Sequence, residues 1–153
     1  KRQDIRILQD QLDREREYRY ELNNLREYMF QVKNEYIPIK SDKTLDHYIK
    51  DKNILIIGGS KYWRMRFKEK YNEIRTLNGF NENFDISILK SVDYVFFYTG
   101  LMSHSTYNKA MKVIRINQIK FGYIGKTNID LVEEEIIEEL KKCEIGGKAN
   151  LSD

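Results

Sequence analysis

The stretch Asn53-Ile54-Leu55-Ile56-Ile57-Gly58-Gly59-Ser60 decides the fold of this 153-residue chain. Four consecutive aliphatic residues followed by two glycines and a serine are typical of a buried parallel strand that enters a turn before a helix. In a doubly wound α/β sheet, the first such turn is where phosphate-bearing ligands usually lie. The stretch therefore predicts an architecture and one candidate site, and it leaves the reaction open.

The chain after this stretch continues to alternate between strand and helix. Periodicity predicts strands at 53–57, 73–77, 93–98 and 119–124, and helices at 61–71, 86–92, 105–117 and 131–143. Such an alternation indicates parallel strands joined by right-handed crossovers. We therefore expect an α/β fold with a small four-stranded parallel sheet in the order 2-1-3-4, as in Rossmann-like and flavodoxin-like folds. The switch point of this sheet lies between the first and third strands.

Two loops are expected to meet at the switch point, and they supply the candidate site. Glycines permit positive φ and close backbone approach, and a serine can cap the following helix, whose free N–H groups attract anions. The predicted ligand-binding residues are Gly58, Gly59, Ser60, Lys61, Arg64, Thr99, Gly100, Ser103 and His104. We expect a phosphate-bearing small ligand or nucleic acid here. The alternative is a pair of tight turns that bind nothing.

His104 raises a second alternative, which is catalysis. A histidine can act as a general base, and Ser103 can be a nucleophile when a base activates it. The sequence shows no partner acid for His104, and Ser103 or Ser105 can instead cap the next helix. We therefore assign no catalytic residue and keep a phosphotransfer or hydrolytic enzyme that uses His104 as the alternative.

The segment before the sheet, from about Asp4 to Glu35, contains no glycine or proline and is rich in charge. One apolar stripe with coiled-coil spacing consists of Tyr18, Leu22, Leu25, Met29, Val32 and Tyr36, and an out-of-phase stripe consists of Ile5, Leu8 and Leu12. At about 1.5 Å per residue, this helix would be about 45–50 Å long, too long to lie over a small domain. A homodimeric coiled coil is the leading interpretation. A long helix folded back on its own domain is the alternative.

These elements divide the chain into four regions. Residues 1–37 are the coiled-coil helix, 38–52 a linker with a short helix, 53–145 the Rossmann-like α/β domain and 146–153 a disordered tail. The sequence begins in helical register without a methionine, so we expect a further N-terminal part. A set of glutamates in the last helix is expected to form a solvated face, namely Glu133, Glu134, Glu135, Glu138 and Glu139.

Composition excludes several kinds of site. The formal net charge of +3 is too small to require a nucleic-acid or membrane partner, and no apolar run approaches the ~20 residues of a membrane helix. The single cysteine, Cys143, excludes an intramolecular disulfide and favours a cytoplasmic location. One cysteine and two separated histidines do not make a zinc site of the usual types, so we expect neither a metal nor a cofactor.

At these residues the chain resembles a bacterial family known as domain-of-unknown-function family 2325. Its members resemble a short Rossmann-like module, with a strand that ends in Gly-Gly near its start and a Ser-His pair after a later strand. Ile56-Ile57-Gly58-Gly59 and Ser103-His104 match these features, and the resemblance covers about 53–143. It implies the fold and, from some members, an N-terminal coiled coil, but no established activity.

The leading hypothesis is a non-enzymatic bacterial regulatory or accessory protein. It would form a homodimer through the N-terminal helix and bind its ligand at the ends of the first and third strands. A purely structural protein–protein adaptor is a further alternative.

Overall fold

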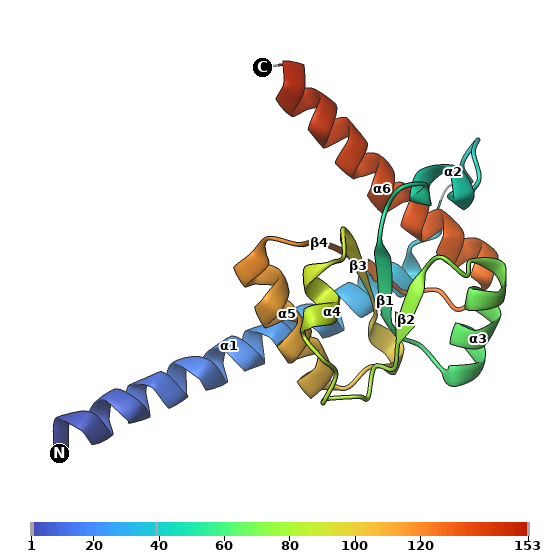
Figure 1. Ribbon diagram of the computed structural model, residues 1–153. Helices are drawn as coiled ribbons and strands as arrows, with labels where there is room; N and C mark the ends of the chain where they lie inside the picture. Colours follow the sequence, from blue (N-terminus) through green and yellow to red (C-terminus); the bar gives the residue numbers. More distant parts are fainter. Residues whose placement is uncertain (1, 39, 153) are drawn as a thin grey trace.

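A four-stranded parallel sheet forms the centre of the molecule in the computed structural model, which describes residues 2–38 and 40–152, with side chains for 2–38 and 40–143. The strands are β1 (Ile54–Gly58), β2 (Arg75–Leu77), β3 (Tyr94–Tyr98) and β4 (Lys120–Ile124). Their order is β2-β1-β3-β4 (Figure 1). The α/β class and the strand order 2-1-3-4 are therefore confirmed.

Helices cover both faces of the sheet. α2 (Leu45–Ile49), α3 (Lys61–Lys70) and α6 (Ile129–Ser152) pack on one face, and α4 (Ser87–Lys90), α5 (His104–Asn117) and part of α1 (Arg2–Glu35) pack on the other. Every residue of β1 and β3 is buried. This burial explains why both central strands are continuous apolar runs rather than alternating ones.

The predicted boundaries differ most at the second strand and at the C-terminus. β2 is only three residues long and partly exposed, as suits an edge strand with one neighbour. The backbone of α6 stays helical to Ser152, across most of the region 146–153 that was assigned to a tail. The side chains beyond Cys143 lie outside the described residues. Among the helices described, none has the length and apolarity needed to cross a bilayer.

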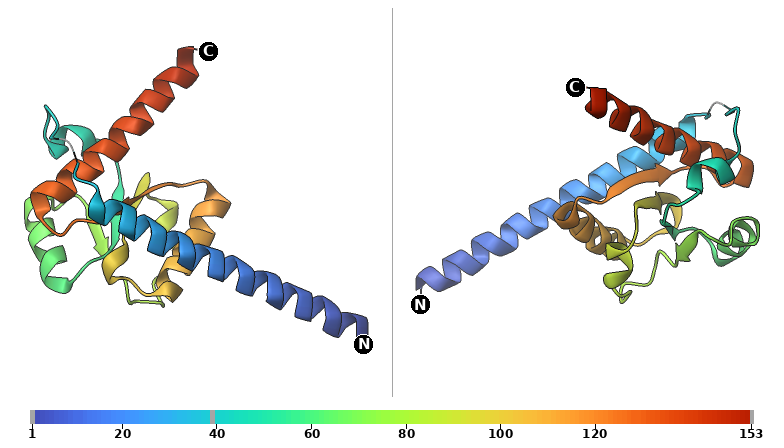
Figure 2. Two further views of the ribbon diagram at one scale, coloured as in Figure 1. Left: turned by 180° about the vertical axis from the view of Figure 1, so that it is seen from behind. Right: turned by 45° about the horizontal axis from the view of Figure 1, so that its top comes forward.

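α1 is one long helix whose two halves have different surroundings. In its second half, Leu22, Arg26 and Lys33 are buried against the domain, where α1 contacts β4, α5 and the short 3-10 turn η1 (Thr99–Leu101). Its first half, residues 2–17, extends beyond the domain and is exposed throughout (Figures 1 and 2). The folded-back alternative therefore applies to the second half of the helix.

The residues of α1 that pack against the domain follow the predicted stripe only in part, at Tyr18, Leu22 and Met29. The inward positions are Leu22, Arg26, Met29 and Lys33, whereas three members of the predicted stripe are 40%, 40% and 42% exposed, namely Leu25, Val32 and Tyr36. Before Leu22, the next residue that packs against the domain is Tyr18. The second stripe, which consists of Ile5, Leu8 and Leu12, lies on the projecting half and is exposed. Apolar spacing alone does not identify the inward side of α1, because two of its inward residues, Arg26 and Lys33, are charged.

Candidate ligand site at the carboxyl edge of the sheet

The β1–α3 turn holds three of the predicted ligand-binding residues, and each has a structural role. Gly58 and Gly59 have φ angles of +110° and +87°, which residues with side chains rarely adopt. A Cβ on Gly58 would also lie 2.5 Å from the carbonyl oxygen of Tyr98. The Ser60 hydroxyl accepts a hydrogen bond of 3.1 Å from the Trp63 N–H and so caps α3. The fold alone accounts for all three residues.

Lys61 and Arg64 lie on the first turn of α3, beside this turn. Lys61 is exposed, and the Nε of Arg64 donates a long hydrogen bond of 3.4 Å to the Ser60 carbonyl oxygen. Their positive charges add to that of the helix N-terminus, where the dipole favours anions. This part of the site retains the electrostatic character that a phosphate would need.

The loop after β3 consists of η1 and the start of α5. The Ser103 hydroxyl accepts from the Thr106 N–H at 3.1 Å and donates to the Thr106 Oγ1 at 2.8 Å, so it caps α5. Because this hydroxyl is held by the cap, Ser103 and His104 do not form a nucleophile–base pair. Gly100 lies against α1, where a Cβ would be 2.9 Å from the ring of Phe30.

The loops that follow β1, β2 and β3 are joined backbone to backbone. The Gly59 N–H donates to the Leu101 carbonyl oxygen at 3.2 Å, and the Ser103 N–H donates to the Gly79 carbonyl oxygen at 2.9 Å. A Cβ on Gly79 would lie 2.9 Å from the Cα of Gly58. The two predicted loops thus lie side by side, as the strand order requires. Between Gly79 and Gly58, however, there is no room even for a methyl group.

Arg26 of α1 reaches the same edge of the sheet. Its Nη2 donates to the carbonyl oxygens of Thr99 and Met102 at 2.7 and 2.6 Å, and the residue is only 8% exposed. Its Nη1 donates to the Glu27 Oε1 at 2.8 Å. The guanidinium therefore satisfies two carbonyl groups that follow the end of β3. Both terminal nitrogens of Arg26 are thus bound to protein acceptors, whereas its buried Nε has no partner among the described residues.

His104, the first residue of α5, has a carboxylate neighbour that the sequence did not reveal. Its Nε2 lies 3.8 Å from the Glu27 Oε1 and 3.3 Å from the Arg26 Nη1. The side chains of His104 and Glu27 are 52% and 59% exposed. A distance of 3.8 Å is too long for a hydrogen bond, and water screens a pair this exposed. Because a guanidinium only donates, the His104 Nε2 accepts from Arg26 in this arrangement, and Glu27 does not orient the ring as a general base.

The sequence singled out neither Arg26 nor Glu27, because charged side chains on a helix are mostly exposed. The signal that could have identified Arg26 is its spacing. It lies four residues after Leu22 and three before Met29, inside the inward stripe. An arginine within an apolar stripe indicates a buried polar contact, because such charges are rarely buried without partners.

A groove of ≈ 720 Å³ lies beside the β1–α3 turn, between the length of α3 and the N-terminal end of α6. Trp63 lines it, and its Nε1 donates to the Thr127 carbonyl oxygen at 2.9 Å. Lys70 also lines it, with its Nζ 2.5 Å from the Glu133 Oε1 and 3.8 Å from the Asp130 Oδ1. Because this cation is paired with carboxylates, it does not give the groove a preference for anions.

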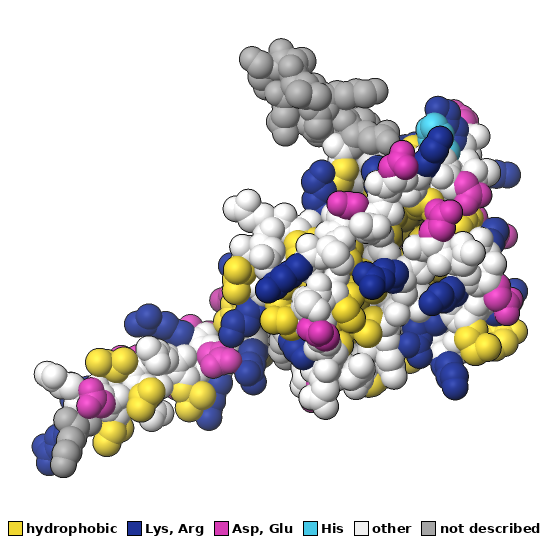
Figure 3. Space-filling view, viewed as in Figure 1, with side chains coloured by type: hydrophobic (Ala, Val, Ile, Leu, Met, Phe, Trp, Pro, Cys, Tyr) yellow, Lys and Arg dark blue, Asp and Glu magenta, His cyan; other side chains and the backbone are white. Residues whose placement is uncertain are grey.

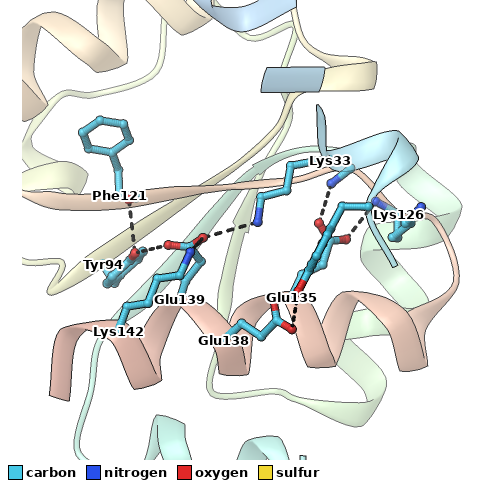
Figure 4. Close-up of polar contacts among 10 residues, drawn as sticks. Lys33, Tyr94, Phe121, Lys126, Glu135, Glu138, Glu139 and Lys142 are labelled. Carbon is cyan, nitrogen blue, oxygen red and sulfur yellow. Dashed lines mark hydrogen bonds and ion pairs between the residues drawn. The ribbon is translucent and has the colours of Figure 1, made fainter. Parts of the chain in front are cut away.

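A polar network joins α1, β4 and α6 (Figure 4). Glu135 is 1% exposed, and its two carboxylate oxygens accept from the Gly125 and Lys126 N–H groups at 2.9 Å each. Burial raises the pKa of Glu135, although these two hydrogen bonds partly offset the effect. Glu139, whose side chain is 16% exposed, pairs with Lys33 at 3.3 Å. The predicted solvated glutamate face is therefore wrong at Glu135, because the β4–α6 turn needs an acceptor for its N–H groups. It is also wrong at Glu133 and Glu139, whose side chains are each only 16% exposed and pair with Lys70 and Lys33.

Among the described residues, no group of three or more His, Cys, Asp or Glu side chains is placed to hold a metal ion. A scan against models of known protein families, a search of curated proteins and a search of solved structures each gave no match. The resemblance to family 2325 therefore stays a prediction that rests on residues 56–59 and 103–104.

Proposed function

We propose that this protein is a homodimeric, non-enzymatic regulatory or accessory protein of the bacterial cytoplasm, whose two α/β domains are joined through α1. The first half of α1 carries the proposal. Its stripe residues Ile5, Leu8 and Leu12 are 65%, 64% and 44% exposed on a helix that projects from the domain. Figure 3 shows apolar side chains gathered along this projecting end.

A second helix would stabilise this projecting half. Isolated helices of about 12–15 residues are marginal in water, because most helical stability in proteins comes from packing. Full burial of one Leu or Ile side chain contributes about 1.5–3 kcal/mol. A second copy of the chain carries the same stripe and so offers a matching surface.

The geometry of the candidate site supports the non-enzymatic part of the proposal. The Ser103 hydroxyl is held by its cap, and the Arg26 guanidinium is bound to backbone carbonyls. The His104 ring is half exposed, and no carboxylate among the described side chains lies within hydrogen-bond distance of it. These arrangements stabilise the fold, and none of them activates a nucleophile.

Ligand binding at the ends of β1 and β3 stays a separate prediction. The Thr99 hydroxyl favours it, since its oxygen is buried and has no hydrogen-bond partner among the described residues. The direct contact of the loops opposes it in this conformation, because the backbones at Gly58 and Gly79 leave no room between them for a phosphate. The dimer proposal does not depend on this ligand.

Sedimentation velocity over a range of protein concentrations tests the dimer. We expect the native chain to dimerise, and the triple variant Ile5→Ala, Leu8→Ala, Leu12→Ala to raise the dissociation constant more than tenfold. Alanine keeps the helix propensity high, so the change isolates the loss of apolar contact. Ile7→Ala is the control, because Ile7 is 55% exposed on the same turns but lies off the stripe. A native chain that stays monomeric, or a triple variant that dimerises like the native chain, contradicts the proposal.

A further inference from the structure

We propose that the solvent-facing side of α3 binds single-stranded nucleic acid, with one base stacked on Tyr62 and the flanking phosphates held by Lys61, Arg64 and Arg66. This surface lies outside the filled contact between the loops after β1 and β3, and it goes beyond the proposed function. Each domain carries its own copy of α3, so the surface does not require the dimer. Unpaired positive charge, an exposed aromatic ring and an adjacent groove on this one helix support it.

α3 carries an excess of positive charge that the protein does not neutralise. Its ten residues include five basic side chains and one acidic side chain, Glu69. Of the five, only Lys70 forms an ion pair within the part of the chain that the structure describes, with Glu133 and Asp130. The other four have no carboxylate partner there, namely Lys61, Arg64, Arg66 and Lys68. Cations of this kind bind a polyanion strongly, because each contact with a phosphate releases a counterion.

The aromatic ring of Tyr62 lies among these charges and is open to solvent. Trp63 and Phe67 hold α3 on the sheet and are 6% and 0% exposed, whereas Tyr62 is 69% exposed and adds nothing to that core. The Arg66 guanidinium lies over the Tyr62 ring, 5.7 Å from its centroid. Figure 3 shows basic side chains gathered around apolar ones at the end of the molecule where α3 lies. Bases stack on exposed aromatic rings whatever the sequence, and a neighbouring arginine strengthens the contact.

The groove between α3 and α6 begins at this ring. Tyr62 and Arg66 line it from α3, and Thr127 and Asn128 line it from the turn before α6. Its volume of ≈ 720 Å³ lies within the range of about 300–1,000 Å³ that is typical of small-molecule sites. Because the charge of Lys70 in this groove is neutralised by carboxylates, the groove suits an uncharged base. The unpaired cations beside it suit the phosphates.

The ring and the groove favour a single strand over a duplex or a bilayer. In a duplex the bases are already paired and stacked, so none is free to stack on Tyr62. A helix that lies on a bilayer inserts a broad apolar face. On α3, whose residues are all described, only Tyr62 and Met65 are exposed large apolar residues. Single-stranded DNA and single-stranded RNA share the chemistry that this surface recognises.

Fluorescence anisotropy with labelled oligothymidylate and oligouridylate tests the proposal and distinguishes DNA from RNA. Strands of about 12 nucleotides suit one domain, because single-strand binding sites span about 4–16 nucleotides. We expect the native chain to bind at low salt. Tyr62→Ala should raise the dissociation constant about tenfold and leave the salt dependence unchanged, because it removes stacking and no charge. Arg64→Ala should also weaken binding, and it should reduce the slope of log K against log salt by about 0.7, because one phosphate contact is lost.

Two control variants lie elsewhere on the chain. Tyr20, on α1, is 69% exposed like Tyr62, so Tyr20→Ala removes an equally exposed ring. Lys112 is exposed on α5, so Lys112→Ala removes the same charge as Arg64→Ala. Both controls should bind like the native chain. Circular dichroism checks that every variant keeps its helix content.

Several outcomes would overturn the proposal. One is no binding at low salt, and another is an equal loss of affinity in the control variants. A duplex that binds as tightly as the single strand, with Tyr62→Ala unaffected, would show backbone contact without stacking. Sedimentation with vesicles of phosphatidylcholine and phosphatidylserine, without binding of either oligonucleotide, would assign α3 to a membrane surface.

The nucleic-acid proposal and the dimer proposal fail separately. The triple variant Ile5→Ala, Leu8→Ala, Leu12→Ala keeps α3 unchanged, so it should bind the short strands like the native chain. If the native chain is monomeric yet binds them with the effects expected for Tyr62→Ala and Arg64→Ala, the dimer fails and the α3 surface stands. A dimer without affinity for either strand leads to the opposite conclusion.

Discussion

Arg26 ties α1 to the end of β3 through two carbonyl oxygens, at 2.7 and 2.6 Å. Arg26→Ala removes both bonds and leaves the Thr99 and Met102 carbonyls without this donor. Because hydrogen bonds from charged donors are the stronger ones, we expect the free energy of unfolding to fall by about 2–3 kcal/mol. Urea denaturation followed by circular dichroism measures the loss.

Arg19→Ala is the matched control for this change, seven residues earlier on the same helix. Its ion pair with Glu15 is exposed, so the free energy of unfolding should change by no more than about 0.5 kcal/mol. Equal losses in the two variants would show that Arg26 acts only through helix propensity.

Glu135 makes the free energy of unfolding depend on pH, and the sign of this dependence is unusual for a carboxylate. Its pKa in the folded state is raised above the ordinary value of 4.5 by burial, so the folded state holds the proton more tightly than the unfolded state. The contribution of Glu135 to stability is therefore full below pH 4.5 and is lost as the pH rises through its folded pKa. Relative to Glu135→Gln, the native chain should be more stable at the acidic end of this window, and the difference should shrink as the pH rises.

Denaturation of both proteins across this window measures the effect. Glu134→Gln is the control at the neighbouring position. A difference between the native chain and Glu135→Gln that grows with pH would contradict the raised pKa.

At the scale of the element, α1 is held by the stripe that begins at Leu22. Leu22 is 5% exposed, whereas Leu25 is 40% exposed. Leu22→Ala should lower the free energy of unfolding by about 2–4 kcal/mol, because it leaves a cavity against the domain. Leu25→Ala should cost less than about 1 kcal/mol in this contact, because much of its side chain remains in water. Urea denaturation of both variants measures the two losses. A larger loss for Leu25→Ala than for Leu22→Ala would show that Leu25, rather than Leu22, faces the domain.

The sequence predicted the elements of the sheet well, because their signals are local. Four aliphatic residues before Gly58 define β1, and Ser60 and Ser103 both cap helices in ways that the sequence allows. The phase of α1 was not predictable from apolar spacing alone, because Arg26 and Lys33 face inward. Their partners, backbone carbonyls and Glu139, are distant in the sequence.

The sequence predicted where the candidate site lies, but not whether the site has room for a ligand. The strand order places the loops after β1 and β3 together, and the structure has them in contact. Whether such loops leave a space between them depends on backbone distances of a few tenths of an ångström at Gly58 and Gly79, which no residue pattern encodes. The position of Arg26 at the end of β3 depends in turn on how α1 packs against the domain.

At the scale of the whole molecule, the helix content should depend on protein concentration. In a monomer, residues 2–17 lack a partner and should fray, whereas in the dimer they pack against a second helix. The circular dichroism signal at 222 nm should therefore grow with concentration, by an amount on the order of a tenth of the total helical signal. The triple alanine variant at Ile5, Leu8 and Leu12 should show no such growth. A concentration-independent signal in a native chain known to dimerise would show that this half is helical without its partner.

The position of α1 against β4 has a consequence for solubility. β4 is an outer strand of the sheet, paired with β3 on one side only, and α1 packs against it. The Lys126 Nζ donates to the Asn34 carbonyl oxygen at 2.5 Å, which holds the end of the helix beside this strand. An uncovered outer strand can recruit a strand from another molecule and start sheet-to-sheet polymerisation. The docked half of α1 thus shields β4 from strand addition, while in the proposed dimer the projecting half pairs with a second helix.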